Sequence, residues 1–97
     1  MSEAYKEFLV SNLLNEPSKV AVSGVVVSKQ DNGFLLDDGT GQLVVSLENF
    51  EFSEGSYIRA FGQLVPFEEG KELQAFFVQD ISSMDKEVHR KVLEGLQ

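Results

Sequence analysis

The sequence predicts a small all-β domain, a barrel or a sandwich, with an amphipathic helix at each end. Five runs rich in β-branched and aromatic residues follow one another at short, regular spacing. Turns that contain glycine separate these runs, and helices do not alternate with strands as they do around parallel sheets. A chain of 97 residues has room for one hydrophobic core, so a single domain over residues 1–97 is expected.

The predicted strands lie between about residues 19 and 81. The first strand runs from Lys19 to Lys29 and carries Gly24 in its middle, where a bulge or bend lets one long strand serve both halves of a barrel. The other four are expected at residues 34–36, 43–47, 57–65 and 73–81. Apolar residues recur at alternate positions of the last strand, which predicts that Leu73, Ala75, Phe77 and Ile81 face the core. Residues 48–55 match no element.

The two ends of the chain show helical spacing of apolar residues. A short helix is expected over about residues 3–14, with Ser2 as its N-cap and with apolar residues at i, i+3 and i+4. A second helix is expected over about residues 84–96. Its apolar stripe repeats every four residues, at Met84, Val88, Val92 and Leu96. Because so short a helix is marginal alone, the stripe must cover either its own barrel or a partner.

Composition and charge exclude several classes of function. The chain has no cysteine and one histidine, His89, so it lacks the residues of a zinc site, and His89 is expected at the surface or in an interface. The pair Asp37–Asp38 precedes Gly-Thr-Gly and is interpreted as turn-forming. No nucleophile–base set or phosphate-binding glycine motif is present, so we expect neither an enzyme nor a cofactor. Without a signal peptide or apolar span, a soluble intracellular protein is expected, with no membrane partner.

Three stretches form a recognisable combination: Val22-Ser-Gly-Val-Val, Phe34-Leu-Leu-Asp-Asp-Gly-Thr-Gly, and Tyr57-Ile-Arg-Ala-Phe-Gly-Gln-Leu-Val-Pro-Phe running into Lys71-Glu-Leu-Gln-Ala-Phe. The last continues into Ile81-Ser-Ser-Met-Asp-Lys-Glu-Val-His. Together they resemble the OB (oligonucleotide/oligosaccharide-binding) domain of the middle subunit of replication protein A and its relatives in telomere-capping complexes. In size the chain is more like the smallest subunit or a minimal archaeal relative. The resemblance implies a five-stranded Greek-key OB barrel that binds single-stranded DNA in replication and repair, in the nucleus of a eukaryote or the cytoplasm of an archaeon.

The resemblance also implies where nucleic acid and partner subunits bind. Single strands are expected along strands two and three and the neighbouring loops. Phe67 matches the family's stacking phenylalanine, although it also suits sealing of the barrel end. The other candidates are Lys29, Phe34, Arg59 and Lys71. Phe34 equally suits the core. For Arg59 the alternative, a side chain that solvates the outer sheet surface, is favoured over a phosphate contact. In the family the C-terminal helix packs against helices of two other subunits, so the interface candidates are Met84, Val88, Val92 and Leu96.

The net charge keeps a rival hypothesis open. Sixteen acidic residues against eight basic ones give a net charge of -8, which repels a phosphate backbone. The first hypothesis is a replication-protein-A-like subunit that binds single-stranded DNA weakly by itself. The alternatives are a protein assembly module that never contacts nucleic acid and an RNA-binding barrel. The sequence does not choose between DNA and RNA.

Overall fold

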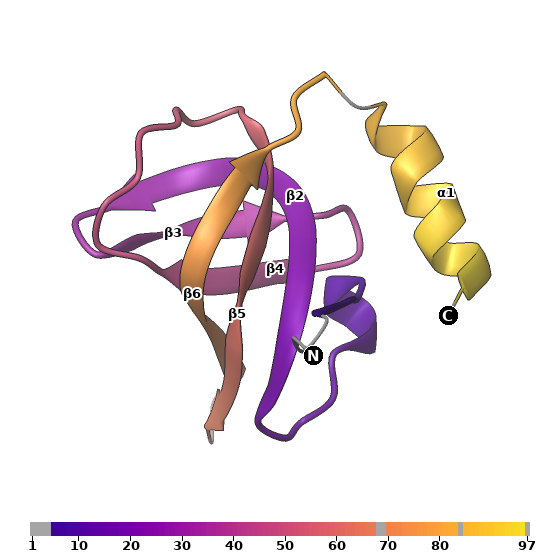
Figure 1. The fold of residues 1–97 in the computed structure, drawn as a ribbon, viewed down its shortest axis with the longest axis horizontal. Helices are drawn as coiled ribbons and strands as arrows, with labels where there is room; N and C mark the ends of the chain where they lie inside the picture. The colour runs from indigo at the N-terminus through magenta and orange to yellow at the C-terminus, as the bar shows by residue number, and fades with distance from the viewer. Residues whose placement is uncertain (1–4, 68–69, 84, 97) are drawn as a thin grey trace, which may run out of the picture.

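The protein forms a closed β-barrel with a helix beside it (Figure 1). The computed structural model describes residues 5–67, 70–83 and 85–96. Its elements in chain order are β1 (Lys6–Glu7), the 3-10 turn η1 (Val10–Asn12), β2 (Ser18–Gln30), β3 (Gly33–Asp37), β4 (Gln42–Ser46), β5 (Tyr57–Phe67), β6 (Gly70–Asp80) and α1 (Lys86–Leu96). Within these residues no helix is both long and apolar enough to cross a membrane.

One long strand closes the barrel, as the sequence predicts. β2 pairs with β5 from Ser18 to Val25 and with β3 from Val25 to Gln30. β3 pairs with β4, β4 runs parallel to β6, and β6 returns to β5, so the five strands form a ring. Gly24 lies next to the point where β2 changes partner, and a Cβ there would lie 2.8 Å from the carbonyl oxygen of Asp37. Only glycine permits this close approach, and the predicted OB barrel is confirmed.

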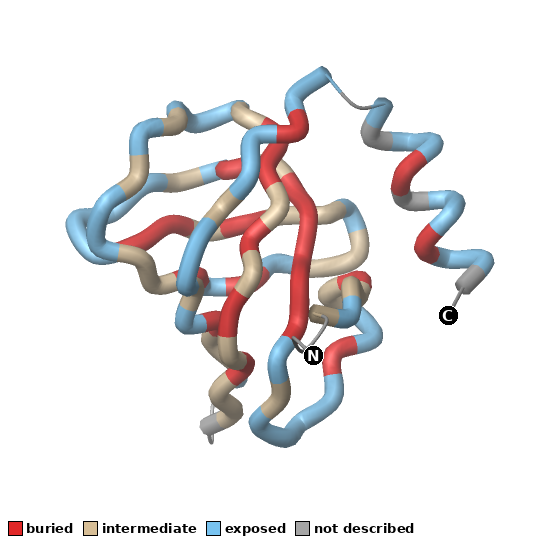
Figure 2. Tube along the Cα trace, in the orientation of Figure 1, coloured by how far each residue is buried: buried red, intermediate tan, exposed pale blue. Residues whose placement is uncertain are grey.

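The alternating apolar residues of the strands fill the barrel, and Figure 2 shows this buried core running along β2. Side chains that point inward are fully or almost fully buried, while their neighbours along each strand face outward. The largest fully buried ones are Val20, Val22, Val26, Phe34, Leu36, Val45, Ile58, Leu64 and Leu73. The predicted strands are therefore correct in their positions and in which side chains face the core, with one exception in β6 that is described below.

The helix predicted over residues 3–14 is wrong. In its place the described residues form β1, which pairs in parallel with β2, and the single turn η1. The apolar pattern is still satisfied, because Leu9 and Leu13 are buried against the barrel. The backbone finds partners outside a helix: the Phe8 N–H donates to the carbonyl of Ala21 over 3.0 Å, and the Val10 N–H donates to Asp38 Oδ2 over 2.8 Å. These contacts with the barrel therefore stabilise the observed conformation more than the hydrogen bonds of a short helix would, since such a helix is marginal alone.

The aspartates before Gly-Thr-Gly are turn formers, as interpreted from the sequence. Asp37 Oδ1 accepts the Gly39 N–H over 2.8 Å, and Asp38 Oδ1 accepts the Thr40 N–H over 2.9 Å. Asp38 has a second role that the sequence did not indicate, since its other oxygen holds the N-terminal segment at Val10. The same turn thus joins β3 to β4 and anchors the start of the chain.

Candidate nucleic-acid and partner surfaces

The groove predicted for nucleic acid follows β3, β4 and the neighbouring loops, and the sheet continues from β4 onto β6 and β5. Across it the register aligns one row of outward side chains, made by Leu35, Val44, Glu72 and Val65. Val44 is 49% exposed, so the row is open to solvent. It contains three aliphatic residues and one carboxylate, with neither an aromatic ring nor a cation. Single-strand grooves use rings for stacking and cations for phosphates, and this row supplies neither.

The five predicted binding residues do not form one groove. Phe34 is 2% exposed, and its ring packs edge-on against Phe50 and Phe52, with centroid distances of 5.4 and 5.0 Å. Phe34 is therefore a core residue with no face for a base. Lys29 pairs with Phe34 at the end of β2, and its Nζ lies 5.5 Å from the centroid of the Phe50 ring. The unassigned segment 48–55 thus provides the aromatic residues that seal this end of the barrel.

Two of the remaining candidates lie on the β5–β6 hairpin. Lys71 is half-buried and pairs with Pro66 near the tip of the β5–β6 hairpin. The backbone of Phe67 ends β5 and pairs with Gly70, whereas its side chain lies outside the described part of the structure. Stacking by Phe67 therefore stays a prediction.

Arg59, the fifth candidate, belongs to a cluster of polar side chains centred on Glu7. The Arg59 Nε lies 3.1 Å from Glu7 Oε1, and the Arg59 Nη1 donates to Gln79 Oε1 over 3.2 Å. Ser23 donates from its hydroxyl to the other oxygen of Glu7 over 2.5 Å. Arg59 therefore ties β5 to β1 and β6, and these internal contacts hold its guanidinium in place.

The same carboxylate anchors α1 to the barrel. The Nε2 atom of His89 lies 2.9 Å from Glu7 Oε2, and its Nδ1 lies 3.3 Å from the hydroxyl of Tyr57. The Glu7 carboxylate accepts a hydrogen bond from Nε2, and Nδ1 shares a second hydrogen bond with the Tyr57 hydroxyl. Burial raises the pKa of Tyr57, and the negative charge of Glu7 raises it further, so the phenol keeps its proton. His89 was expected at the surface or in an interface; it is buried between the chain's own helix and barrel, so the surface alternative is wrong.

Only one face of α1 lies against the barrel. His89 and Leu93, one turn apart, are 9% and 8% exposed. Val88 and Val92, on the neighbouring face, are 58% and 56% exposed. Two members of the predicted stripe therefore face solvent, while Met84 and the side chain of Leu96 lie outside the described part of the structure.

A cavity of about 340 Å³ separates α1 from the barrel. Leu9, Val25 and Leu93 give it apolar walls, and the carboxylates of Asp37, Asp38 and Glu87 line it as well. Among the helix side chains that the structure describes, His89 and Leu93 are the ones buried beside this space. The sequence contained no signal for this cavity, since its walls come from segments far apart along the chain.

A further surface that the sequence did not predict lies on the outer side of β5 and β6. Phe61 and Phe77 stack with a centroid distance of 4.5 Å and an interplanar angle of 18°, and Tyr5 packs edge-on against both. Phe76 and Phe77 are 57% and 50% exposed. The placement of Phe77 in the core was wrong, because β6 contains a bulge where Phe61 pairs with Phe77 but Gly62 pairs with Ala75. We call Tyr5, Phe61, Phe76 and Phe77 the aromatic patch.

Comparison with known proteins supports the fold. No protein-family model and no curated protein matches the sequence. Among solved structures, the chain is similar to one in the S. pombe Stn1–Ten1 complex, with a TM-score of 0.79 and 14% identity over 100% of this chain and 95% of that one.

Two more solved structures share the architecture. The telomere capping protein Ten1 of S. pombe gives a TM-score of 0.78 at 14% identity, covering 97% of this chain and 98% of that one. A replication protein A heterotrimer bound to single-stranded DNA gives 0.60 at 24% identity, covering 81% and 72%. The predicted resemblance is thus confirmed at the level of the fold: the chain is an OB barrel with a C-terminal helix, like barrels found in telomere-capping and replication-protein-A complexes.

Proposed function

We propose that the protein is a subunit of a replication-protein-A-like complex, in which α1 docks onto other subunits and the assembly binds single-stranded DNA in replication or repair. The observation that carries the proposal is the exposed pair Val88 and Val92 on a helix whose neighbouring face is anchored by His89 and Leu93. Apolar residues this exposed at helical spacing are typical of helix-to-helix docking. The proposed role is binding and assembly without catalysis, in the nucleus of a eukaryote or the cytoplasm of an archaeon.

Replacing both valines by glutamate is expected to release the partner subunits. Docking would then bury two carboxylates without partners, and each unpaired buried charge costs several kcal/mol. The stability of the isolated chain should change by less than about 1 kcal/mol, because both positions are exposed. The measurement is co-purification from native extract, followed by identification of the captured chains as subunits of a DNA-binding complex.

Lys91→Glu is the matched control, because Lys91 is also exposed on α1. The substitution makes the helix more negative without removing an apolar contact. This variant should retain the subunits. Retention by Val88→Glu/Val92→Glu as well would exclude docking through this face. The purified chain alone should bind a single strand of about 20 nucleotides only weakly, because its charge of -8 opposes phosphate binding. Nanomolar affinity of the isolated chain in 0.2 M salt would contradict this expectation.

The second candidate function is an assembly module whose barrel contacts only protein. It is favoured by the row Leu35, Val44, Glu72 and Val65, which offers neither ring nor cation in the expected groove. If Phe67 and Lys71 provide stacking and charge, replacing both by alanine should weaken DNA binding of the assembly at least tenfold, since each stacked base contributes roughly 1–3 kcal/mol. Filter binding of the reconstituted assembly measures this loss. Unchanged affinity would remove these two residues from the DNA site.

A further inference from the structure

The aromatic patch is exposed because of the bulge in β6. Ala75 and Val78 both pack against the core. In a regular strand these two positions would face opposite sides, so an extra residue must lie between them. Phe76 and Phe77 therefore both face outward, opposite Phe61 on β5. A Cβ at Gly62 would lie 2.2 Å from the carbonyl of Gln74, so glycine at this position permits the bulge. The extra residue in β6, permitted by Gly62, thus places both phenylalanine side chains on the outer face.

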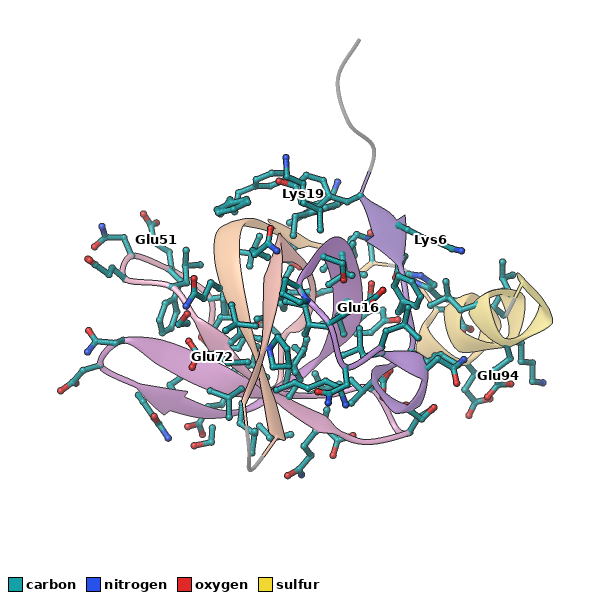
Figure 3. The ribbon with its side chains drawn as sticks, turned by 90° about the horizontal axis from the view of Figure 1, so that it is seen from below. Lys6, Glu16, Lys19, Glu51, Glu72 and Glu94 are labelled. Atoms are coloured by element: carbon teal, nitrogen blue, oxygen red, sulfur yellow. The ribbon has the colours of Figure 1, made fainter. Side chains whose placement is uncertain are left out.

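The described residues around the patch include three amides, two cations and two carboxylates. Along the same outward face, Lys19 pairs with Gln63 and Gln63 pairs with Gln74 on one side of the rings. On the other side Ser23 pairs with Arg59 and Arg59 pairs with Gln79. Figure 3 shows Lys19 at the edge of the barrel next to β1, apart from Glu51, Glu72 and Glu94. Among the described residues, two carboxylates also lie on this outward face. Glu7 pairs with Ala21 in the row of the rings and contacts Ser23, Arg59 and His89, and Glu72 pairs with Val65 in the row beyond Gln63 and Gln74.

We propose that unpaired nucleic-acid bases stack on Phe76 and Phe77, so that single strands cross the outer face of β5 and β6 instead of the β3–β4 groove. This inference rests on the proposed function and names the site for it. Half-exposed rings provide a face for any base, flanking amides donate and accept hydrogen bonds at base edges, and Lys19 provides a cation for phosphate. The β3–β4 row has none of these groups. A protein partner would also cover rings, but the three glutamines beside the rings suit base edges and the exposed Lys19 suits a phosphate.

A titration of the 15N-labelled chain with dT12, and separately with rU12, tests the site in 50 mM salt. Amide shifts should move in residues 61–63 and 74–79, while Leu35 and Val44 stay still. Phe76→Ala/Phe77→Ala should weaken binding at least tenfold, because it removes two stacking platforms. Lys19→Glu should weaken binding. It should also reduce the slope of log affinity against log salt concentration by about one, because one phosphate contact is lost. Equal affinity for dT12 and rU12 is expected, because stacking on a ring needs neither the 2′-hydroxyl nor the 5-methyl group by which the two differ.

Two control variants separate the outcomes. Leu35→Ala/Val44→Ala changes the other face and should leave affinity unchanged. Phe76→Ala alone removes the more exposed ring and keeps the Phe61–Phe77 stack, so it should weaken binding without unfolding the chain. Binding that survives the double phenylalanine change but is lost in Leu35→Ala/Val44→Ala would overturn this site and leave the proposed function standing. A wild-type chain that binds neither oligonucleotide, alone or within its assembly, would overturn both.

Discussion

Phe34→Ala is expected to lower the free energy of unfolding by about 3–5 kcal/mol, the usual cost of removing a buried phenylalanine ring. Phe34 is 2% exposed and lies at the centre of the contacts with Phe50 and Phe52. Its removal would leave a cavity at the barrel end, where these two rings would lose their common partner. Urea denaturation followed by far-ultraviolet circular dichroism measures the change.

Phe76→Ala provides the comparison, since the same substitution at a 57% exposed position should change stability by no more than about 0.5 kcal/mol. The two variants should also differ in function. Phe34→Ala should affect oligonucleotide binding only where it unfolds the chain. If Phe34→Ala left stability intact and abolished binding, the assignment of this ring to the core would be wrong, and the groove predicted from the sequence would regain its stacking residue.

Glu7→Ala is expected to detach α1 and to destabilise the barrel by about 3 kcal/mol, the low end for breaking a buried ion pair. The Glu7 and Arg59 side chains are 18% and 21% exposed, so water screens the ion pair only in part. Without the carboxylate, Arg59 and His89 would face the barrel without their acceptor. Amide hydrogen exchange should accelerate through α1 more than through β3 and β4, because His89 and Leu93 are the described helix side chains that are buried against the barrel.

Glu51→Ala is a suitable control, since it removes the same charge from an exposed loop position and should change stability by less than about 0.5 kcal/mol. The His89 contact can be tested apart from the Arg59 contact. His89→Ala should release the helix and leave the barrel folded. Protection of α1 that persists in Glu7→Ala would show that Leu93 and the His89–Tyr57 contact hold the helix without the carboxylate. A detached helix would also dock less well onto partners, so the anchor and the Val88–Val92 face are expected to act together.

The strands could be predicted because their signals are local. β-branched runs with a period of two, bounded by turns such as Asp37–Gly41, identify strands without any knowledge of their neighbours. The same approach failed at the N-terminus, where Leu9 and Leu13 have helical spacing but are buried by an extended segment and one 3-10 turn. The spacing correctly predicted which residues are buried. It did not predict the backbone conformation, because hydrogen bonds to Ala21 and Asp38 replace those of a helix.

The candidate site was predicted less completely than the fold. Val88 and Val92 could be found, because an apolar pair on a terminal helix is visible in the sequence. The aromatic patch could not, because one extra residue in β6 moves Phe77 from the core face to the outer face. The adjacent phenylalanines at positions 76 and 77 were the available signal, since two large apolar residues in succession cannot both face the core of a regular strand. The ion pair of Arg59 with Glu7 could not be predicted either, because the two residues lie 52 positions apart in the sequence.

By itself, the sequence determined the all-β class, the position of each barrel strand, the long first strand with Gly24, and a terminal helix with one unsatisfied apolar face. These features depend on residue type and on spacing along the chain. Only the tertiary structure decided which rings are buried, which carboxylate holds α1, and which outer face carries exposed aromatic residues. Closure of the barrel brings Glu7, Arg59 and His89 together from three separate elements, and the bulge shifts the register of β6 by one residue. Contacts of this kind arise from how the strands close on one another, and no local pattern contains them.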